Sequence, residues 1–200
     1  VKIGYCREER IKKGCGEVMI ERAEVSTSLL LVIDMQDKLL QAIDGKEVIL
    51  QQTERMMKYA NTLEIPIIVT EQYKKGLGES NQKIQAEAID NQVFEKISFS
   101  AFDTEEIANS IKTYNPKTIV ICGVEAHICV CQTALAALVE GYDVRVISDA
   151  VGSRTEFNKQ IGMKRLENAG IIIDSTESIL YEWLKMAGTP EFKKILPLVK

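Results

Sequence analysis

The stretch "KTIVICGVEAHICVCQTALAALVE", residues 117–140, joins two segments with different hydrophobic patterns. Its first eight residues form an apolar run of strand length, which is typical of a strand buried on both faces of a sheet. After Gly123 the chain turns, and the segment from Ala126 to Glu140 predicts a helix of ordinary length. A buried strand leading directly into a helix is the repeating unit of a parallel sheet covered by helices.

The same alternation runs along the chain from Ser28 onward. Further strands are predicted at residues 28–35, 65–72, 92–99, 142–150 and 170–176, and further helices at residues 46–64, 104–114, 155–168 and 177–186. We expect a loop around Gly76 and Gly78 and a polar tail after the last helix. The pattern predicts one domain, residues 28–200, with a three-layer α/β/α, Rossmann-like architecture. Its mostly parallel sheet has about six strands, joined by right-handed crossovers.

Residues 1–27 show no clear strand or helix period and are predicted to be an N-terminal extension, with Met19 as an alternative start. The extension lacks the apolar core of a signal peptide, and the longest apolar runs of the chain are too short to span a membrane. A cytoplasmic protein with reduced thiols is the expectation.

The bulk composition excludes two classes of protein. Hydrophobic residues make up 46% and charged residues 27% of the chain, a balance that argues against disorder. A net charge of −4 provides no basic surface for nucleic acid. We therefore expect a small-molecule substrate and no nucleic-acid or membrane partner.

The fold class indicates where a site would lie. In open α/β sheets, ligands bind beyond the carboxyl ends of the strands. The polar residues that end the apolar runs are therefore the candidates: Asp34, Glu71, Lys96, Glu125, Asp149 and Ser175. The turn "DMQDKLL" after the first strand has neither a dinucleotide-binding glycine motif nor a Walker lysine, which disfavours a nucleotide-dependent enzyme.

The stretch 117–140 holds three of the five cysteines and the only histidine, a composition that raises the possibility of a metal site or a disulfide. Cys129 and Cys131 are two residues apart and point to different sides of a helix, and no second cysteine pair lies elsewhere. The cysteine count is odd and the expected compartment is reducing. Neither a structural metal site nor a disulfide is favoured.

A cysteine nucleophile fits the placement of Cys129 better. A thiol in the first turn of a helix faces free N–H groups and the positive end of the helix dipole, which favour the thiolate. Asp34 is the natural base, and Lys96 would place positive charge beside both groups. Each residue also has a structural explanation. Cys129 could be a buried thiol, Asp34 a helix cap or a structural hydrogen-bonding residue, and Lys96 a solvated lysine of an edge strand. Cys122 is best explained as a strand-core residue and His127 as a structural or entrance residue.

Three blocks now resemble a known family. "LLLVIDMQ" with Asp34, "FEKISFSAF" with Lys96, and "ICGVEAHICVCQTALAAL" with Cys129 look like the signature blocks of the isochorismatase-like cysteine hydrolases. "TEQYKKGLG", "SDAVGSR" and "DSTESILYEWL" look like further blocks of its isochorismatase-domain-containing subgroup. The resemblance runs from about Leu29 to the C-terminal tail.

The resemblance implies a catalytic triad in which Asp34 takes the proton from Cys129, Cys129 attacks an amide-like carbon, and Lys96 stabilises charge. It also implies a cis peptide between Val124 and Glu125 that directs the N–H groups of Glu125 and Cys129 at the oxyanion. Homo-oligomers are common in such a family.

Two departures from the patterns of named family members narrow the range of possible substrates. Nicotinamidases of the family carry a histidine-containing metal motif after the second strand, but "TEQYKKGLGESNQK" has no histidine. True isochorismatases do not need the thiol, so a cysteine at position 129 favours covalent chemistry. We therefore expect a metal-independent hydrolase without a cofactor. The alternatives are a non-catalytic binding or assembly module, and isochorismatase or nicotinamidase activity.

The candidates to line the substrate pocket are Gln36, Tyr73 and Phe99, although each of them could instead serve only in packing.

Overall fold

A parallel sheet forms the centre of the protein. The computed structural model describes residues 10–12, 17–19, 22–88 and 92–199. The strands are β1 (Arg10–Lys12), β2 (Glu17–Met19), β3 (Ser28–Ile33), β4 (Ile67–Gln72), β5 (Val93–Lys96), β6 (Thr118–Val124), β7 (Asp143–Gly152) and β8 (Ile172–Asp174). Among the described residues, β3 to β8 form one sheet in the order β5-β4-β3-β6-β7-β8, and all neighbouring strands in it are parallel.

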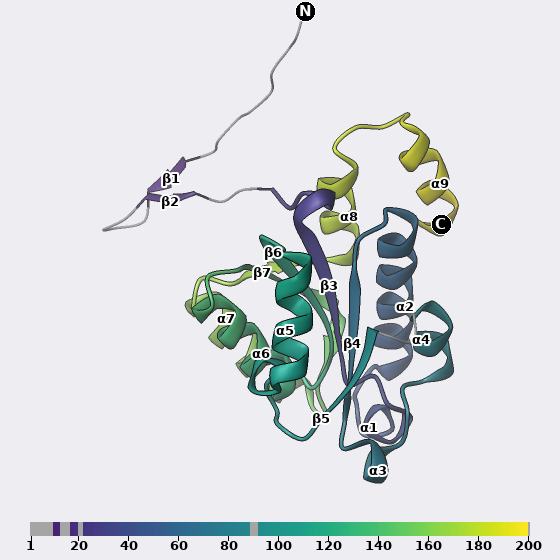
Figure 1. Ribbon diagram of the computed structural model, residues 1–200, viewed down its shortest axis with the longest axis vertical. Helices are drawn as coiled ribbons and strands as arrows, with labels where there is room; N and C mark the ends of the chain where they lie inside the picture. Colours follow the sequence, from purple (N-terminus) through teal and green to yellow (C-terminus); the bar gives the residue numbers. More distant parts are fainter. Residues whose placement is uncertain (1–9, 13–16, 20–21, 89–91, 200) are drawn as a thin grey trace, which may run out of the picture.

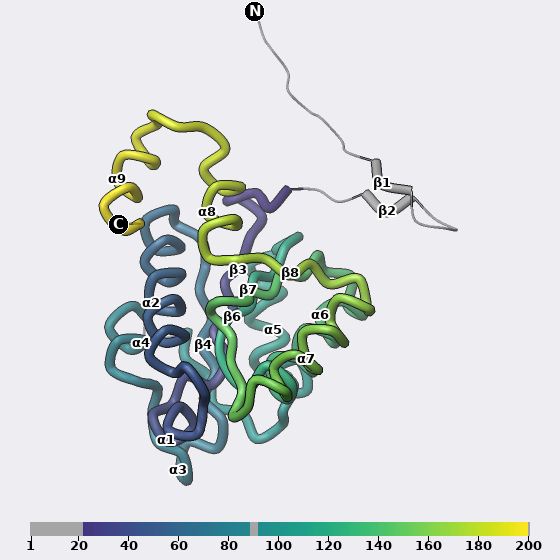
Figure 2. Tube along the Cα trace, turned by 180° about the vertical axis from the view of Figure 1, so that it is seen from behind, coloured from purple at the N-terminus to yellow at the C-terminus, as the bar shows by residue number. Residues whose placement is uncertain are grey.

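Helices cover both faces of this sheet (Figures 1 and 2). They are α1 (Asp37–Leu40), α2 (Lys46–Thr62), α3 (Lys74–Leu77), α4 (Gln82–Glu87), α5 (Glu105–Tyr114), α6 (Cys129–Val139), α7 (Glu156–Asn168), α8 (Thr176–Leu184) and α9 (Pro190–Val199). Helices α2, α8 and α9 pack on one face, and α5, α6 and α7 on the other. The three-layer α/β/α architecture predicted from the sequence is confirmed.

The apolar run of β3 explains how one strand supports two cores. All six of its residues are buried, and successive side chains of a strand point to opposite faces. Leu30 and Val32 join the core beneath α2 and α8, whereas Leu29, Leu31 and Ile33 join the core beneath α5 and α6. A strand buried on both sides has no polar face, which is why its sequence is continuously apolar.

The strand order reverses next to β3. The chain passes from β3 outward to β4 and β5, then returns to place β6 on the other side of β3. Gly123 lets the two strands approach closely at their carboxyl ends, because a Cβ there would lie 2.0 Å from the Ile33 carbonyl oxygen, and its φ is +116°. Open α/β sheets bind their ligands at such a reversal.

Several segments differ from the prediction. The expected loop around Gly76 contains the short helices α3 and α4, and the expected polar tail forms α9. In α9, Thr189 Oγ1 accepts a hydrogen bond from the Phe192 N–H at 3.1 Å, and Ile195 is buried in the core. Charged residues between the apolar ones hid that pattern. Within the predicted extension, β1 and β2 form a short antiparallel pair.

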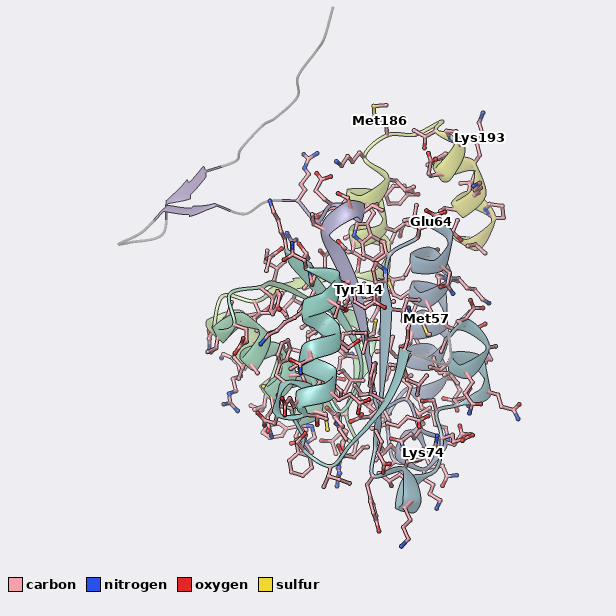
Figure 3. All side chains as sticks on the ribbon, viewed as in Figure 1. Met57, Glu64, Lys74, Tyr114, Met186 and Lys193 are labelled. Carbon is pink, nitrogen blue, oxygen red and sulfur yellow. The ribbon has the colours of Figure 1, made fainter. Side chains whose placement is uncertain are left out.

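The end of the extension contacts the domain. Ala23 is buried, and its N–H donates to Glu182 of α8 at 2.9 Å. Cys6 and Cys15 lie outside the described residues. No helix in the described part of the chain is both long and apolar enough to cross a membrane. In Figure 3, Lys74 lies at the carboxyl end of the sheet, and Met186 and Lys193 lie at the opposite end.

Candidate active site

Asp34 follows β3 at the reversal of the sheet. It adopts a left-handed backbone conformation with φ of 53° and is fully buried. Its Oδ1 accepts a hydrogen bond from the Thr70 hydroxyl at 2.7 Å, and its Oδ2 accepts one from Lys96 Nζ, also at 2.7 Å. The carboxylate is therefore fixed in orientation by groups from β4 and β5, the two neighbouring strands on one side.

Lys96 ends β5 and reaches across the end of β4 to Asp34. Neither side chain of this ion pair is exposed to solvent. The ammonium also donates to Gln72 Oε1 at 2.6 Å and to the Ser98 carbonyl oxygen at 3.3 Å. A buried charge is costly unless it is paired and hydrogen-bonded, and here all three ammonium protons have acceptors. The pair is therefore a buried ion pair whose orientation is fixed by polar groups of β4 and of the segment after β5.

Cys129 is the first residue of α6 and is 7% exposed. Burial and the charge of the neighbouring Asp34 raise the pKa of its thiol to about 12, and the Lys96 ammonium lowers that pKa only in part. The expectation that the helix terminus favours a thiolate is therefore wrong for the resting protein, because desolvation outweighs it. Cys129 is a neutral thiol beside a carboxylate and an ammonium.

Neither of the other two cysteines of this stretch has the Asp34–Lys96 pair beside it. Cys122 is fully buried in the core beneath α2, on the opposite face of the sheet from Cys129. Cys131 is buried on the Cys129 side, and burial raises its pKa. Among the described residues, no three His, Cys, Asp or Glu side chains gather as a metal site would require.

The turn between β6 and α6 has an unusual backbone. The peptide bond between Val124 and Glu125 is cis, at the position that the family resemblance implies. The Ala126 N–H donates to the Gly152 carbonyl oxygen at 2.7 Å, and the N–H groups of Ile128 and Val130 donate to the Glu125 carbonyl oxygen. Within the described part of the chain, the N–H groups of Glu125 and Cys129 donate to no other backbone group.

Comparison with known proteins assigns the chain to a family. The family model of the isochorismatase domain matches residues 28–178, which include all the elements that form the site. The chain belongs to the isochorismatase family. Isochorismatase family protein 1B of Dictyostelium discoideum is 37% identical over 179 residues, which are 87% of this chain and 86% of that protein.

Two solved structures of similar proteins also match this isochorismatase-family chain. MAR1 ribonuclease from Caenorhabditis elegans has a TM-score of 0.84 at 32% identity, and the match covers 90% of this chain and 92% of that one. YcaC from Escherichia coli, described as an octameric hydrolase of unknown specificity, has a TM-score of 0.81 at 22% identity, with 89% and 87% covered. The second likeness supports the fold alone.

The three predicted pocket residues have different environments. Gln36 is fully buried, and its amide bonds three backbone groups: Nε2 donates to the Gln72 and Gly78 carbonyl oxygens, and Oε1 accepts from the Gln72 N–H. Gln36 thus fastens the loop after β4. Tyr73 and Phe99 are about half exposed, on the segments after β4 and β5 that flank Lys96.

Three other strand-end candidates, Glu71, Asp149 and Ser175, make structural hydrogen bonds. Glu71 accepts the Ser80 N–H at 2.7 Å and pairs with Lys74. Asp149 accepts from both the N–H and the hydroxyl of Thr176, at the start of α8, and Ser175 caps that helix.

Sequence reasoning missed several partners of the site. Thr70 and Gln72 alternate with Glu71 along β4 and bond Asp34 and Lys96, a placement that the period of two could have indicated. Arg154 lies in the block "SDAVGSR" and binds the Glu125 carboxylate, but nothing in the sequence pairs those two residues. His127 Nδ1 lies 3.0 Å from Ser153 Oγ, consistent with a structural or entrance residue.

Proposed function

We propose that the chain is a cysteine hydrolase that acts on a small amide-like substrate through Asp34, Lys96 and Cys129, without a metal. One observation supports the proposal: the wholly buried Asp34–Lys96 pair, held at 2.7 Å, lies beside a thiol at the first residue of a helix. A structural ion pair needs no thiol beside it. A nucleophile, a base and a cation in one crevice are the minimum set for acyl transfer.

Acylation begins from the neutral thiol. As Cys129 Sγ attacks the substrate carbonyl carbon, its proton passes to Asp34, and the carbonyl electron pair moves onto oxygen. A thiol with a pKa of about 12 needs this base, since the thiolate is scarce at neutral pH. When the tetrahedral intermediate collapses, the C–N bond breaks and Asp34 returns the proton to the leaving nitrogen, which leaves a thioester on Cys129.

Deacylation repeats the sequence with water. Asp34 takes a proton from water, the hydroxide attacks the thioester carbonyl, and the C–S bond breaks to release the acid and the Cys129 thiolate. Asp34 then returns the proton to sulfur. Lys96 keeps Asp34 oriented and offsets negative charge throughout, because its ammonium contacts Asp34 Oδ2 and lowers the pKa of the thiol.

The backbone N–H groups of the turn before α6 are the donors that stabilise the oxyanion. The N–H groups of Glu125 and Cys129 are unused by the backbone and lie next to the nucleophile in the chain. Preorganised donors of this kind stabilise the charge that develops on the carbonyl oxygen. Tyr73 and Phe99, both about half exposed, stay candidates to contact the substrate, and the buried Gln36 amide fastens the loop after β4.

The class of substrate follows from the chemistry of these groups. A thiol nucleophile suits a carbonyl carbon, which favours hydrolysis of C–N bonds over the vinyl ether of isochorismate. Ribonuclease activity is a second candidate, because the similar Caenorhabditis elegans protein is described as a ribonuclease. The net charge of −4 and the pairing of Lys96 and Arg154 with carboxylates argue against RNA.

Assembly and location are further proposals. We propose that the chain forms a homo-oligomer, as YcaC is described to do, and light scattering of the purified protein tests this. The cytoplasmic location expected from the sequence stays a prediction, which imaging of the tagged native protein tests.

A substrate screen tests the function. Purified protein is incubated with amides, N-carbamoyl compounds, isochorismate and RNA, in parallel with Cys129→Ala. We expect turnover of at least one amide-like compound by the native protein and none by the variant. Equal turnover by both proteins would contradict the covalent mechanism. No turnover of any compound would favour a non-catalytic binding or assembly module.

A further inference from the structure

Three consecutive residues at and just after the end of β7, residues 152–154, contact the turn that precedes Cys129. Gly152 accepts the Ala126 N–H through its carbonyl oxygen at 2.7 Å. The next residue, Ser153, places its hydroxyl 3.0 Å from His127 Nδ1. Arg154 then donates its backbone N–H to Glu125 Oε2 at 2.9 Å. Each residue of the turn from 125 to 127 therefore has its own partner in the segment from 152 to 154.

The contact between Glu125 and Arg154 is the strongest of the three. Arg154 Nη2 lies 2.6 Å from Glu125 Oε1, and Nε donates to Oε2 at 3.1 Å. The planar guanidinium thus grips both carboxylate oxygens, a geometry that fixes direction as well as distance. The Glu125 side chain is 7% exposed, whereas that of Arg154 is 58% exposed. A half-exposed arginine is thus the partner of a buried carboxylate.

Two neighbours keep this arrangement from shifting. Gly162 of α7 lies against the turn so closely that a Cβ there would be 2.8 Å from the Ala126 carbonyl oxygen. On the other side, the Ser153 carbonyl oxygen accepts the Asp44 N–H at 3.1 Å. The segment after β7 is therefore anchored independently of the turn that it holds, which is what a positioning device requires.

We propose that Arg154 is a positioning residue for the oxyanion, acting through Glu125 to hold the N–H groups of Glu125 and Cys129 toward the reacting carbonyl. The inference rests on the proposed function. The site then has two independent halves. Asp34 and Lys96, from β3 and β5, handle the thiol proton, whereas Glu125 and Arg154, from β6 and β7, set the oxyanion donors. Although burial raises the pKa of Glu125, the Arg154 hydrogen bonds lower it overall, so the pair stays ionised at neutral pH.

The two halves can be separated with two reagents that attack the same sulfur. p-Nitrophenyl acetate acylates a thiol through a tetrahedral oxyanion: the S–C bond forms, the thiol proton passes to Asp34, and p-nitrophenolate leaves. Iodoacetamide alkylates a thiol by direct displacement: the thiol loses its proton to solvent, the S–C bond forms, the C–I bond breaks to release iodide, and no oxyanion forms. Site-resolved fragmentation mass spectrometry measures both rates at Cys129 in the full chain.

We expect Arg154→Gln to slow acylation of Cys129 by about tenfold to a hundredfold, the effect of misplacing a catalytic group by up to about 1 Å. Alkylation should stay within about twofold, because the thiol keeps Asp34 and Lys96. Arg165→Gln is the matched control, since Arg165 is an exposed arginine of the neighbouring α7, and it should change neither rate. Equal rates of acylation in Arg154→Gln and native protein would overturn the proposal.

Two further results keep the outcome clear. Arg154→Lys retains a cation beside Glu125 but cannot contact both of its oxygens as Arg154 does, so acylation should still fall while alkylation does not. If either variant slows both reactions equally, Arg154 is a merely structural residue and the proposal is wrong. If native Cys129 is not acylated at all, the proposed function itself fails, whatever Arg154 does.

Discussion

Cys122 and Cys129 are seven residues apart and both are buried thiols, but their side chains have different neighbours. Cys122 lies in β6 with its side chain in the apolar core beneath α2. Burial, with a smaller contribution from Asp149, raises the pKa of its thiol far above the ordinary range. Cys129 is also desolvated, but a carboxylate and an ammonium meet at its sulfur.

Because Cys122 is buried without the Asp34–Lys96 pair beside it, we expect its thiol to be inert. A reactive thiol here needs a base that can take its proton at the moment of attack, and a route for the substrate. The 7% exposure of Cys129 supplies part of that route, whereas Cys122 has none.

Replacing each cysteine by alanine should separate their roles most strongly. Cys129→Ala is expected to lower hydrolysis of the compound found by the screen by about 10⁴-fold or more, the scale seen when a nucleophile is removed. Cys122→Ala should keep most of the activity and lose about 1 kcal/mol of stability as a small core cavity forms. Initial rates and urea denaturation measure the two effects. Loss of activity in Cys122→Ala with an intact fold would break the comparison.

Removing the ammonium should show that the polar centre is buried. Lys96→Met leaves Asp34 without its cation, and breaking a buried ion pair costs about 3–5 kcal/mol of stability. Lys112→Met is the matched control, because the Lys112–Glu140 pair is exposed and separated by 3.8 Å. That surface change should cost about 1 kcal/mol or less in the same urea denaturation experiment. Similar losses in both variants would mean that Asp34 is solvated.

Some of this site could be predicted from the sequence, and some could not. Continuous apolar runs predicted the strands, and the rule for ligand sites in open sheets directed attention to Asp34 and Lys96. The predicted direction of the shift in the Cys129 pKa was wrong. A helix terminus can be recognised in the sequence, but the desolvation of the thiol cannot. The ion pair between Glu125 and Arg154 could not be predicted, because only the register of β6 and β7 brings these two residues together.

The pH dependence of alkylation should sharpen the contrast between the cysteines. Because the pKa of Cys129 is about 12, its labelling by iodoacetamide should rise with pH and should not level off near 9. Between pH 7 and 10 we expect about a tenfold increase per unit, the slope of a rising thiolate fraction. Cys122 should be labelled far more slowly at each pH. A plateau below pH 8 at Cys129 would indicate a resting thiolate.

A smaller effect on stability should report the pairing of Glu125. The pKa of Glu125 is lowered in the folded protein, so the pair stabilises the fold above the ordinary carboxyl pKa of 4.5. That contribution is lost as the pH falls through the lowered value. Arg154→Gln should therefore reduce the free energy of unfolding by about 1–2 kcal/mol at pH 7, with the difference shrinking toward pH 3. A pH-independent difference in urea denaturation would argue against the ion pair as its source.

Trapping the covalent intermediate tests most directly whether Cys129 is the nucleophile and Asp34 its base. Native protein and Asp34→Asn are mixed with p-nitrophenyl acetate, quenched in acid, and mapped by fragmentation mass spectrometry. We predict an acetyl group on Cys129 of the native protein, much less on Cys129 of Asp34→Asn, and none on Cys122 or Cys131 of either. Acetylation of Cys122 or Cys131 in preference to Cys129, or equal acetylation of Cys129 with and without the Asp34 carboxylate, would contradict these roles.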